Sequence, residues 1–151
     1  MAKQRKKSPS YPRELLDDVA WSFTDPPFAS REAFVQAVAG YYTDLEWEFE
    51  WRPDEVVLRS PRVQVRVEYW DDPEELLPGV TFDEDTGDLV ADLTAAGEEG
   101  FTAGELLFKI HNAFAPQLSE GDHHFFEGLE LVKNRDANPN EPPVYEVMTG
   151  S

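Results

Sequence analysis

The segment Arg62-Val63-Gln64-Val65-Arg66-Val67-Glu68-Tyr69 sets the architecture of this chain. Its apolar residues alternate with polar ones, which is the two-residue period of a strand that buries one face and exposes the other. The segment 45–51 has the same alternation, with Leu, Trp and Phe separated by Glu, and a shorter strand is expected at 56–59. Together these segments predict a three-stranded meander whose outer face pairs the arginines of the last strand with the glutamates of the first.

Further strand patterns lie on the C-terminal side of this segment. Residues 79–82 and 89–93 predict two strands joined by an acidic turn, where Gly87 suits the positive φ that a tight hairpin requires. Residues 123–132 predict another strand with a bulge at its glycine, and residues 144–148 predict a final one. The expected sheet is mainly antiparallel and has about five to seven strands.

On the N-terminal side, the pattern changes to the period of 3.6 residues that is typical of helices. Pro12 stands at a first helical position, and the apolar residues after it have helical spacing. This predicts a short helix that ends before the prolines at 26–27, because a proline cannot continue the helical hydrogen bonds. Ser30 then predicts the N-cap of a second helix, which is expected to end near Gly40.

A third helix has the best-marked start in the chain. Thr102 is its predicted N-cap, Glu105 completes a capping box, and Phe101 precedes the cap as one half of a hydrophobic staple. Pro116 is expected to end this helix. The predicted fold class is therefore α+β, with two N-terminal helices, a mainly antiparallel sheet and this further helix packed on one sheet face.

Length and composition favour one folded unit. Of the 151 residues, 40% are hydrophobic and 13% aromatic, so residues 11–151 are expected to form a single α+β domain after a disordered basic tail at 1–10. The chain has no cysteine, which favours a cytoplasmic location over an oxidising compartment. The basic start is not followed by the apolar region of a secretory signal, and no apolar run is long enough to span a bilayer, so no membrane association is expected.

The charge of the chain is strongly negative. The net charge at pH 7 is -18, although four of the 13 basic residues lie within the first seven positions. Residues 67–108 contain no Lys or Arg and are rich in Asp and Glu. Such a surface repels phosphate backbones, so the folded body is not expected to bind nucleic acid. A basic protein is the expected partner.

Trp70 is the expected anchor of a partner-binding surface. It ends its strand in the opposite phase to Tyr69, which places its ring beside an acidic loop, and aromatic residues are frequent at binding hot spots. The other predicted members of this surface are carboxylates of the loop and of the hairpin turn: Asp71, Asp72, Glu74, Glu75, Asp83 and Asp85. The leading hypothesis is a non-enzymatic module that docks a basic protein, of the kind found among immunity proteins and secretion chaperones.

A second hypothesis is a small-ligand or metal-dependent enzyme with a pocket near His111, His123 and Glu127, because all three histidines fall within residues 111–124. Their spacing matches no zinc motif, and adjacent histidines on a strand point to opposite faces. The chain also lacks the Gly-x-Ser-x-Gly, Walker and dinucleotide-binding motifs. No catalytic residue, metal ligand or cofactor is assigned from the sequence, and His111 is expected to have a structural role, hydrogen-bonded near the surface of its helix.

Overall fold

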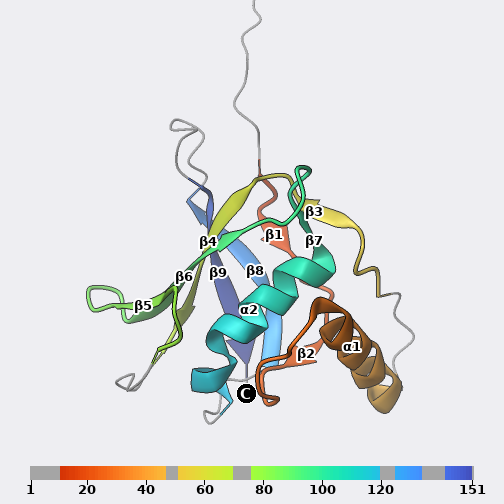
Figure 1. Cartoon of the computed structure of the whole chain (residues 1–151). Helices are drawn as coiled ribbons and strands as arrows, with labels where there is room; N and C mark the ends of the chain where they lie inside the picture. The colour runs from red at the N-terminus through yellow and green to blue at the C-terminus, as the bar shows by residue number, and fades with distance from the viewer. Residues whose placement is uncertain (1–10, 47–50, 70–75, 120–124, 134–141, 151) are drawn as a thin grey trace, which may run out of the picture.

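The computed structural model describes residues 11–46, 51–69, 76–119, 125–133 and 142–150, so the predicted basic tail at 1–10 lies outside it. The described residues form an α+β fold in which α2 crosses one face of a sheet and α1 packs beside α2 (Figure 1). The elements in chain order are β1 Glu14–Leu15, β2 Trp21–Ser22, α1 Arg31–Leu45, β3 Val56–Leu58, β4 Arg62–Glu68, β5 Val80–Asp83, β6 Asp88–Thr94, β7 Phe101–Thr102, α2 Ala103–Leu118, β8 Phe125–Lys133 and β9 Val144–Gly150.

The larger sheet is mixed and has seven strands. Its order is β1-β8-β9-β4-β6-β5, and β2 pairs with β8 next to β1. Strand β4 is antiparallel to β6 and parallel to β9, while the other pairs are antiparallel. Strands β3 and β7 form a separate two-stranded sheet. The C-terminal strand β9 is therefore an interior strand, held between β8 and β4.

The prediction of two N-terminal helices is wrong, because the described chain has one helix early and one late. Residues 12–20 contain strand β1 and a turn. Leu15 pairs with Leu129 of β8, and Trp21 of β2 pairs with Phe126 of the same strand. The apolar spacing of this segment reflects burial along the edge of β8, since tertiary pairing overrides a weak helical pattern.

Helix α1 begins as predicted, because the hydroxyl of Ser30 accepts the backbone N–H three residues later at 3.1 Å. It continues past Gly40 to Leu45, which removes the first residue from the predicted strand at 45–51. Residues 47–50 of that strand lie outside the described chain. The predicted meander is also wrong, because β3 pairs with β7 and the partners of β4 are β6 and β9.

Strands with strong local patterns are confirmed. Strand β4, the hairpin of β5 and β6, and strands β8 and β9 all lie where they are expected. Gly87 has a φ of 79° in the hairpin turn, and β8 has a register shift at Gly128. Their alternation buries the apolar side of the strands in the hydrophobic core, as the fully buried Val63, Val65 and Val67 show.

The start of α2 is confirmed in part. The Thr102 hydroxyl accepts the Glu105 N–H at 3.2 Å, as an N-cap does. The Glu105 carboxylate accepts hydrogen bonds from Ala96 N–H at 2.6 Å and from the Lys109 ammonium at 2.8 Å, so it ties α2 to the preceding loop. Pro116 lies inside the last turn, so the predicted stop is wrong. Neither helix within the described ranges has the length and apolarity to cross a membrane.

Gly128 lets the turn between β1 and β2 lie directly on β8. Its φ is 115°, in the region that side-chain-bearing residues rarely adopt. A Cβ at this position would stand 2.9 Å from the Cα of Asp17, which is closer than carbon atoms normally approach. The glycine therefore permits both the bulge and the close approach of the turn.

We expect Gly128→Ala to lower the free energy of unfolding by about 1–3 kcal/mol, through backbone strain and the contact with Asp17. Gly40→Ala is the matched control, because Gly40 is exposed within α1 and a Cβ there meets nothing within 4 Å. That change should raise stability by up to about 1 kcal/mol, since alanine is the better helix former. Urea denaturation of both variants at pH 7 measures the difference, and equal shifts would contradict this account.

Candidate interaction surface

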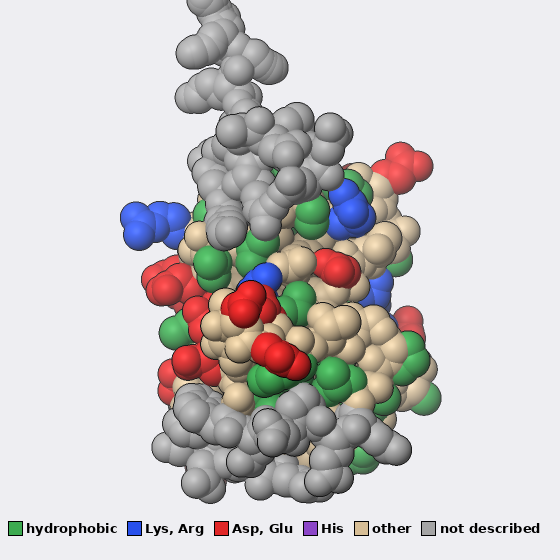
Figure 2. Space-filling model, turned by 90° about the vertical axis from the view of Figure 1, so that its left-hand side faces the viewer, with side chains coloured by type: hydrophobic (Ala, Val, Ile, Leu, Met, Phe, Trp, Pro, Cys, Tyr) green, Lys and Arg blue, Asp and Glu red, His purple; other side chains and the backbone are tan. Residues whose placement is uncertain are grey.

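The sheet face opposite α2 carries the polar side of the strand alternation. We call it the open sheet face. Seen from the β5 edge, acidic side chains gather on one side of the molecule with hydrophobic side chains among them (Figure 2). By strand register the described residues of this face include Glu14, Arg62, Gln64, Arg66, Glu68, Asp83, Asp88, Asp92, Glu130, Val132, Val144, Glu146 and Met148.

Strand register aligns like charges across three neighbouring strands. Glu14 of β1 is paired with Glu130 of β8, and Glu130 is paired with Glu146 of β9. Arg66 of β4 follows Glu146 in the same row. Side chains at directly paired positions share a face and lie close together, so like charges there repel each other and destabilise the sheet. The row of Glu14, Glu130 and Glu146 is therefore retained at a cost in folding free energy.

Arg66 is directed away from this row. Its guanidinium lies 3.2 Å from Asp83 Oδ2 and 3.7 Å from Asp88 Oδ2, and its Nε donates to Gln64 Oε1 at 3.0 Å. Ion pairs between described residues do not include Glu130 or Glu146. Glu48 and Glu50 of the expected outer ladder lie outside the described residues, and Arg66 is held instead by Asp83 and Asp88 of the β5–β6 hairpin.

The pKa values of Glu146 and Asp83, at the two ends of this arrangement, are shifted in opposite directions. Burial raises the pKa of Glu146, and the nearby carboxylates of Asp88, Glu68 and Glu130 raise it further. The pKa of Asp83 is lowered because its carboxylate accepts the Asp85 N–H and also binds Arg66. The negative charge at the hairpin is therefore compensated within the fold, whereas the charge at Glu146 is opposed by its neighbours.

A recess lies between these two ends. It has a volume of about 360 Å³, and its walls include Arg66, Asp85, Asp88, Val132, Val144 and Glu146. Val132 is 49% exposed and Val144 is buried, so the recess combines an apolar wall with carboxylates. Such a lining suits a long side chain that has an aliphatic stem and a cationic head.

The predicted partner residues are placed only in part. Trp70, Asp71, Asp72, Glu74 and Glu75 lie outside the described residues. Asp83 and Asp85 lie in the hairpin at the edge of the recess.

Sequence reasoning missed Glu130 and Glu146. Their meeting depends on the insertion of β9 between β8 and β4, which no local pattern reveals. The alternation in 144–148 was the available signal, because it places Glu146 on the polar side of its strand.

His111 lies fully buried in the core of the fold, so its predicted position near the surface of the helix is wrong. Its Nδ1 accepts the indole N–H of Trp21 at 3.0 Å, and its Nε2 lies 3.1 Å from the carbonyl oxygen of Pro26. An acceptor at Nδ1 and a donor at Nε2 define the neutral imidazole. Phe23 and Phe28 pack on the ring with centroids 5.8 and 5.2 Å away.

The pocket predicted under the second hypothesis is not assembled by the described residues. Both nitrogens of His111 are engaged inside the core, Glu127 is exposed on β8, and His123 lies outside the described chain. The described ranges hold no cluster of three or more His, Asp or Glu side chains arranged to bind a metal ion.

The N-terminus of α2 is also closed to ligands. Its first N–H groups, those of Ala103 and Gly104, each donate at 2.8 Å to carbonyl oxygens of Glu55 and Pro53. These bonds leave the open sheet face as the better candidate surface.

We expect Glu146→Gln to stabilise the protein at neutral pH by a few tenths to about 1 kcal/mol, because it removes one partner of a like-charge cross-strand pair. The pKa of Glu146 is raised in the fold, so the charged form is the less favourable one there. The gain in stability should appear as pH rises through this raised pKa. It should vanish below about 4.5, where Glu146 is protonated in both the folded and the unfolded state. Denaturation at several pH values tests it, with Glu98→Gln in an exposed loop as the control; an equal gain from Glu98→Gln would contradict it.

We expect His111 to resist protonation, because burial lowers its pKa below the usual value of 6.5. Protonation at Nδ1 would also remove the acceptor that Trp21 requires. The unfolded chain takes up this proton first, so His111 makes the fold less stable as pH falls below about 6.5 towards its lower folded pKa. Proton titration by NMR, with the signal assigned through His111→Gln, measures the folded pKa; a value above 6.5 would contradict the neutral tautomer.

Comparisons of the chain with protein-family models, with curated protein sequences and with solved structures found no match. A function is therefore inferred from the charges and contacts of the described residues themselves. The surface that these residues define is the row of Glu14, Glu130 and Glu146 beside the recess on the open sheet face.

Proposed function

We propose that this protein is a non-enzymatic acidic binding module that docks a basic protein partner on the open sheet face. The observation that carries this proposal is the row of Glu14, Glu130 and Glu146 on neighbouring strands. A fold keeps such repulsion when the charges serve a purpose outside folding. Lysine or arginine side chains laid over the row would offset the repulsion and add charge-assisted hydrogen bonds.

The recess beside the row supports the same type of partner. A lysine or arginine of the partner would lay its aliphatic stem along Val132 and Val144 and place its charged head between Asp88 and Glu146. Exposed Met148, on the same face, would add apolar contact. The occupant is therefore a protein with an exposed basic side chain on a positively charged surface.

The charge of the whole chain supports docking in a second way. A net charge of -18 attracts a basic protein over a distance and speeds association, by an amount that falls as salt screens the charges. It also disfavours nucleic acid as a ligand of the folded body. Immunity proteins that neutralise a basic toxin and secretion chaperones are the classes that fit this role, and the absence of cysteine favours action in the cytoplasm.

The test compares three baits at low salt: the unaltered protein, Glu130→Lys/Glu146→Lys, and Glu98→Lys/Glu99→Lys. Both double variants change the net charge equally, but only the first alters the open sheet face, because Glu98 and Glu99 lie in the loop before β7. We expect a basic protein to be captured from lysate of the source cells by the unaltered bait and the loop variant. Its affinity for the face variant should be at least tenfold weaker.

The control for the fold is thermal denaturation of all three baits, which should remain folded at the binding temperature. Capture that is equal on all three baits would overturn the proposal, and so would equal loss on both double variants, because either result shows that the face itself does not matter. Capture that does not fall with added salt would contradict the electrostatic basis.

A further inference from the structure

The open sheet face gathers exposed apolar side chains on two paired strands. Phe125 and Val132 of β8 are 40% and 49% exposed, and Met148 of β9 is 37% exposed. Phe125 is paired with Gly150, which lies two positions after Met148, so the ring of Phe125 lies on the same face. Within the described ranges, two other large apolar side chains reach this exposure, and both lie elsewhere in the fold. Exposed apolar surface with polar residues around it marks interaction sites.

These side chains follow the direction of the strands. Along β9 the open side presents Val144, Glu146, Met148 and Gly150 in that order, and Phe125 of β8 is the partner of Gly150. Each step covers two strand residues, or about 6.6 Å, so the line is roughly 20 Å long. We call it the β9 line. Its order is apolar, acidic, apolar and apolar.

Carboxylates surround the β9 line. Glu14 of β1 lies beyond Glu130 on one flank, and Glu68 of β4 lies on the other flank. At the C-terminal end of β9, the carboxylate of Glu127 lies over Gly150, where a Cβ on that glycine would meet it. An occupant of this surface therefore needs apolar side chains in one line and lysine or arginine side chains beside them.

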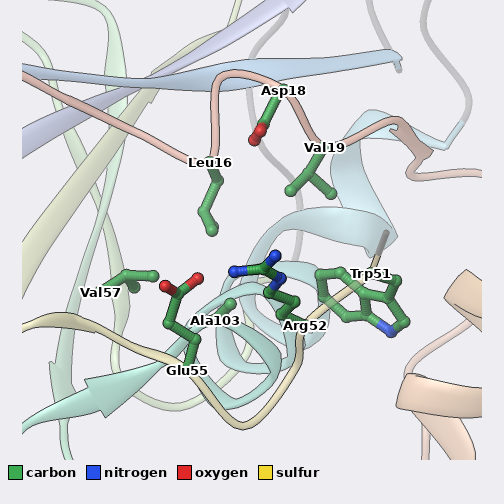
Figure 3. Close-up of a pocket in the computed structure, with 8 residues that line it drawn as sticks. All are labelled: Leu16, Asp18, Val19, Trp51, Arg52, Glu55, Val57 and Ala103. Carbon is green, nitrogen blue, oxygen red and sulfur yellow. The ribbon is translucent and has the colours of Figure 1, made fainter. Parts of the chain in front are cut away.

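The charges of this face differ from those of another cavity of the protein. That cavity has a volume of about 360 Å³ and lies between the turn at 16–19 and the segment at 51–57 (Figure 3). Figure 3 shows the carboxylates of Asp18 and Glu55 directed toward the Arg52 guanidinium, and Arg52 interacts within the chain. The charges of that cavity therefore oppose one another inside the fold, whereas those of the row of Glu14, Glu130 and Glu146 repel one another.

The backbone of the sheet determines the form of the occupant. Strand β9 is bonded to β8 and β4, and β8 is bonded to β9 on one side and to β1 and β2 on the other. An extended segment laid over these strands would find few backbone partners, whereas a helix satisfies its own backbone groups. Helix α2 covers the opposite face of the sheet in this way (Figure 1).

We propose that the open sheet face binds an amphipathic helix of the partner, which lies along β8 and β9. This inference rests on the proposed docking function and names the element that docks. A helix rises about 5.4 Å per turn, so about four turns cover the β9 line. Successive turns would place an apolar side chain on Val132, a lysine or arginine at Glu146, and apolar side chains on Met148 and Phe125. Further basic side chains on both sides of the helix would meet the surrounding carboxylates.

The test measures binding of labelled synthetic peptides of about 18 residues to the full chain at low salt, by fluorescence anisotropy. The first peptide is an alanine-based helix with leucines and lysines on one face in the order of the β9 line. The second has the same composition with its leucines distributed around the helix, and the third is the first with prolines at central positions, which prevent the helix. We expect the first to bind at least about tenfold more tightly than the other two.

Protein variants locate the binding surface. Phe125→Gln/Met148→Gln should weaken binding of the first peptide at least about fivefold, because it removes one apolar end of the β9 line. Leu45→Gln/Leu77→Gln is the matched control, since these side chains are 39% and 37% exposed but lie at the end of α1 and before β5. The control variant should bind as the unaltered protein does, and thermal denaturation should show that both variants are folded.

Equal affinity for the three peptides would overturn the helix inference, and so would the absence of saturable binding of the first peptide up to millimolar concentration. Unchanged affinity in the folded Phe125→Gln/Met148→Gln variant, or an equal loss in the control variant, would also overturn it. The docking proposal is judged separately by capture of a basic protein on the three baits, which does not depend on the form of the docking element. Failure of the helix inference is therefore distinguishable from failure of the docking proposal.

Discussion

The hydrogen bond from the Trp21 indole to His111 Nδ1 is the contact on which the rest of the fold depends. A fully buried imidazole must have both nitrogens satisfied, so α2 can pack only where Trp21 and Pro26 meet it. Asn112 continues the link, because its side-chain amide exchanges two hydrogen bonds of 2.9 Å with the backbone of Phe28. These contacts hold the N-terminal segment between α2 and β8, and so place the turn that lies against Gly128.

Elements with a local physical cause were predictable from the sequence. The alternation in β4, the glycine of the β5–β6 hairpin and the Thr102 cap each act within a few residues, so their effects can be read without knowing the fold. The helix predicted within residues 12–20 is wrong because the apolar spacing there suits a helix and a buried strand edge alike. The pairing with β8 decides between them. The predicted end of α1 near Gly40 is wrong because the residues after Gly40 are also compatible with a helix as far as Leu45.

The residues of the candidate surface also fall into two groups: those that a local sequence pattern could place and those that it could not. The sequence could place Asp83 and Asp85 side by side because a turn collects its carboxylates from neighbouring positions. Glu130 and Glu146 were missed because they meet only through strand order, and one parallel pairing determines that order.

The interior position of β9 determines when the sheet can be completed. Until residues 144–150 have been synthesised, β8 and β4 have no strand between them, and both present unpaired backbone groups. The pairing of Gln64 with Val144 joins parts of the chain that are far apart in sequence, which slows folding. A nascent chain would therefore pass through a state with open strand edges, and its high negative charge would oppose aggregation of that state. The acidity of this protein would then protect its assembly as well as shape its surface.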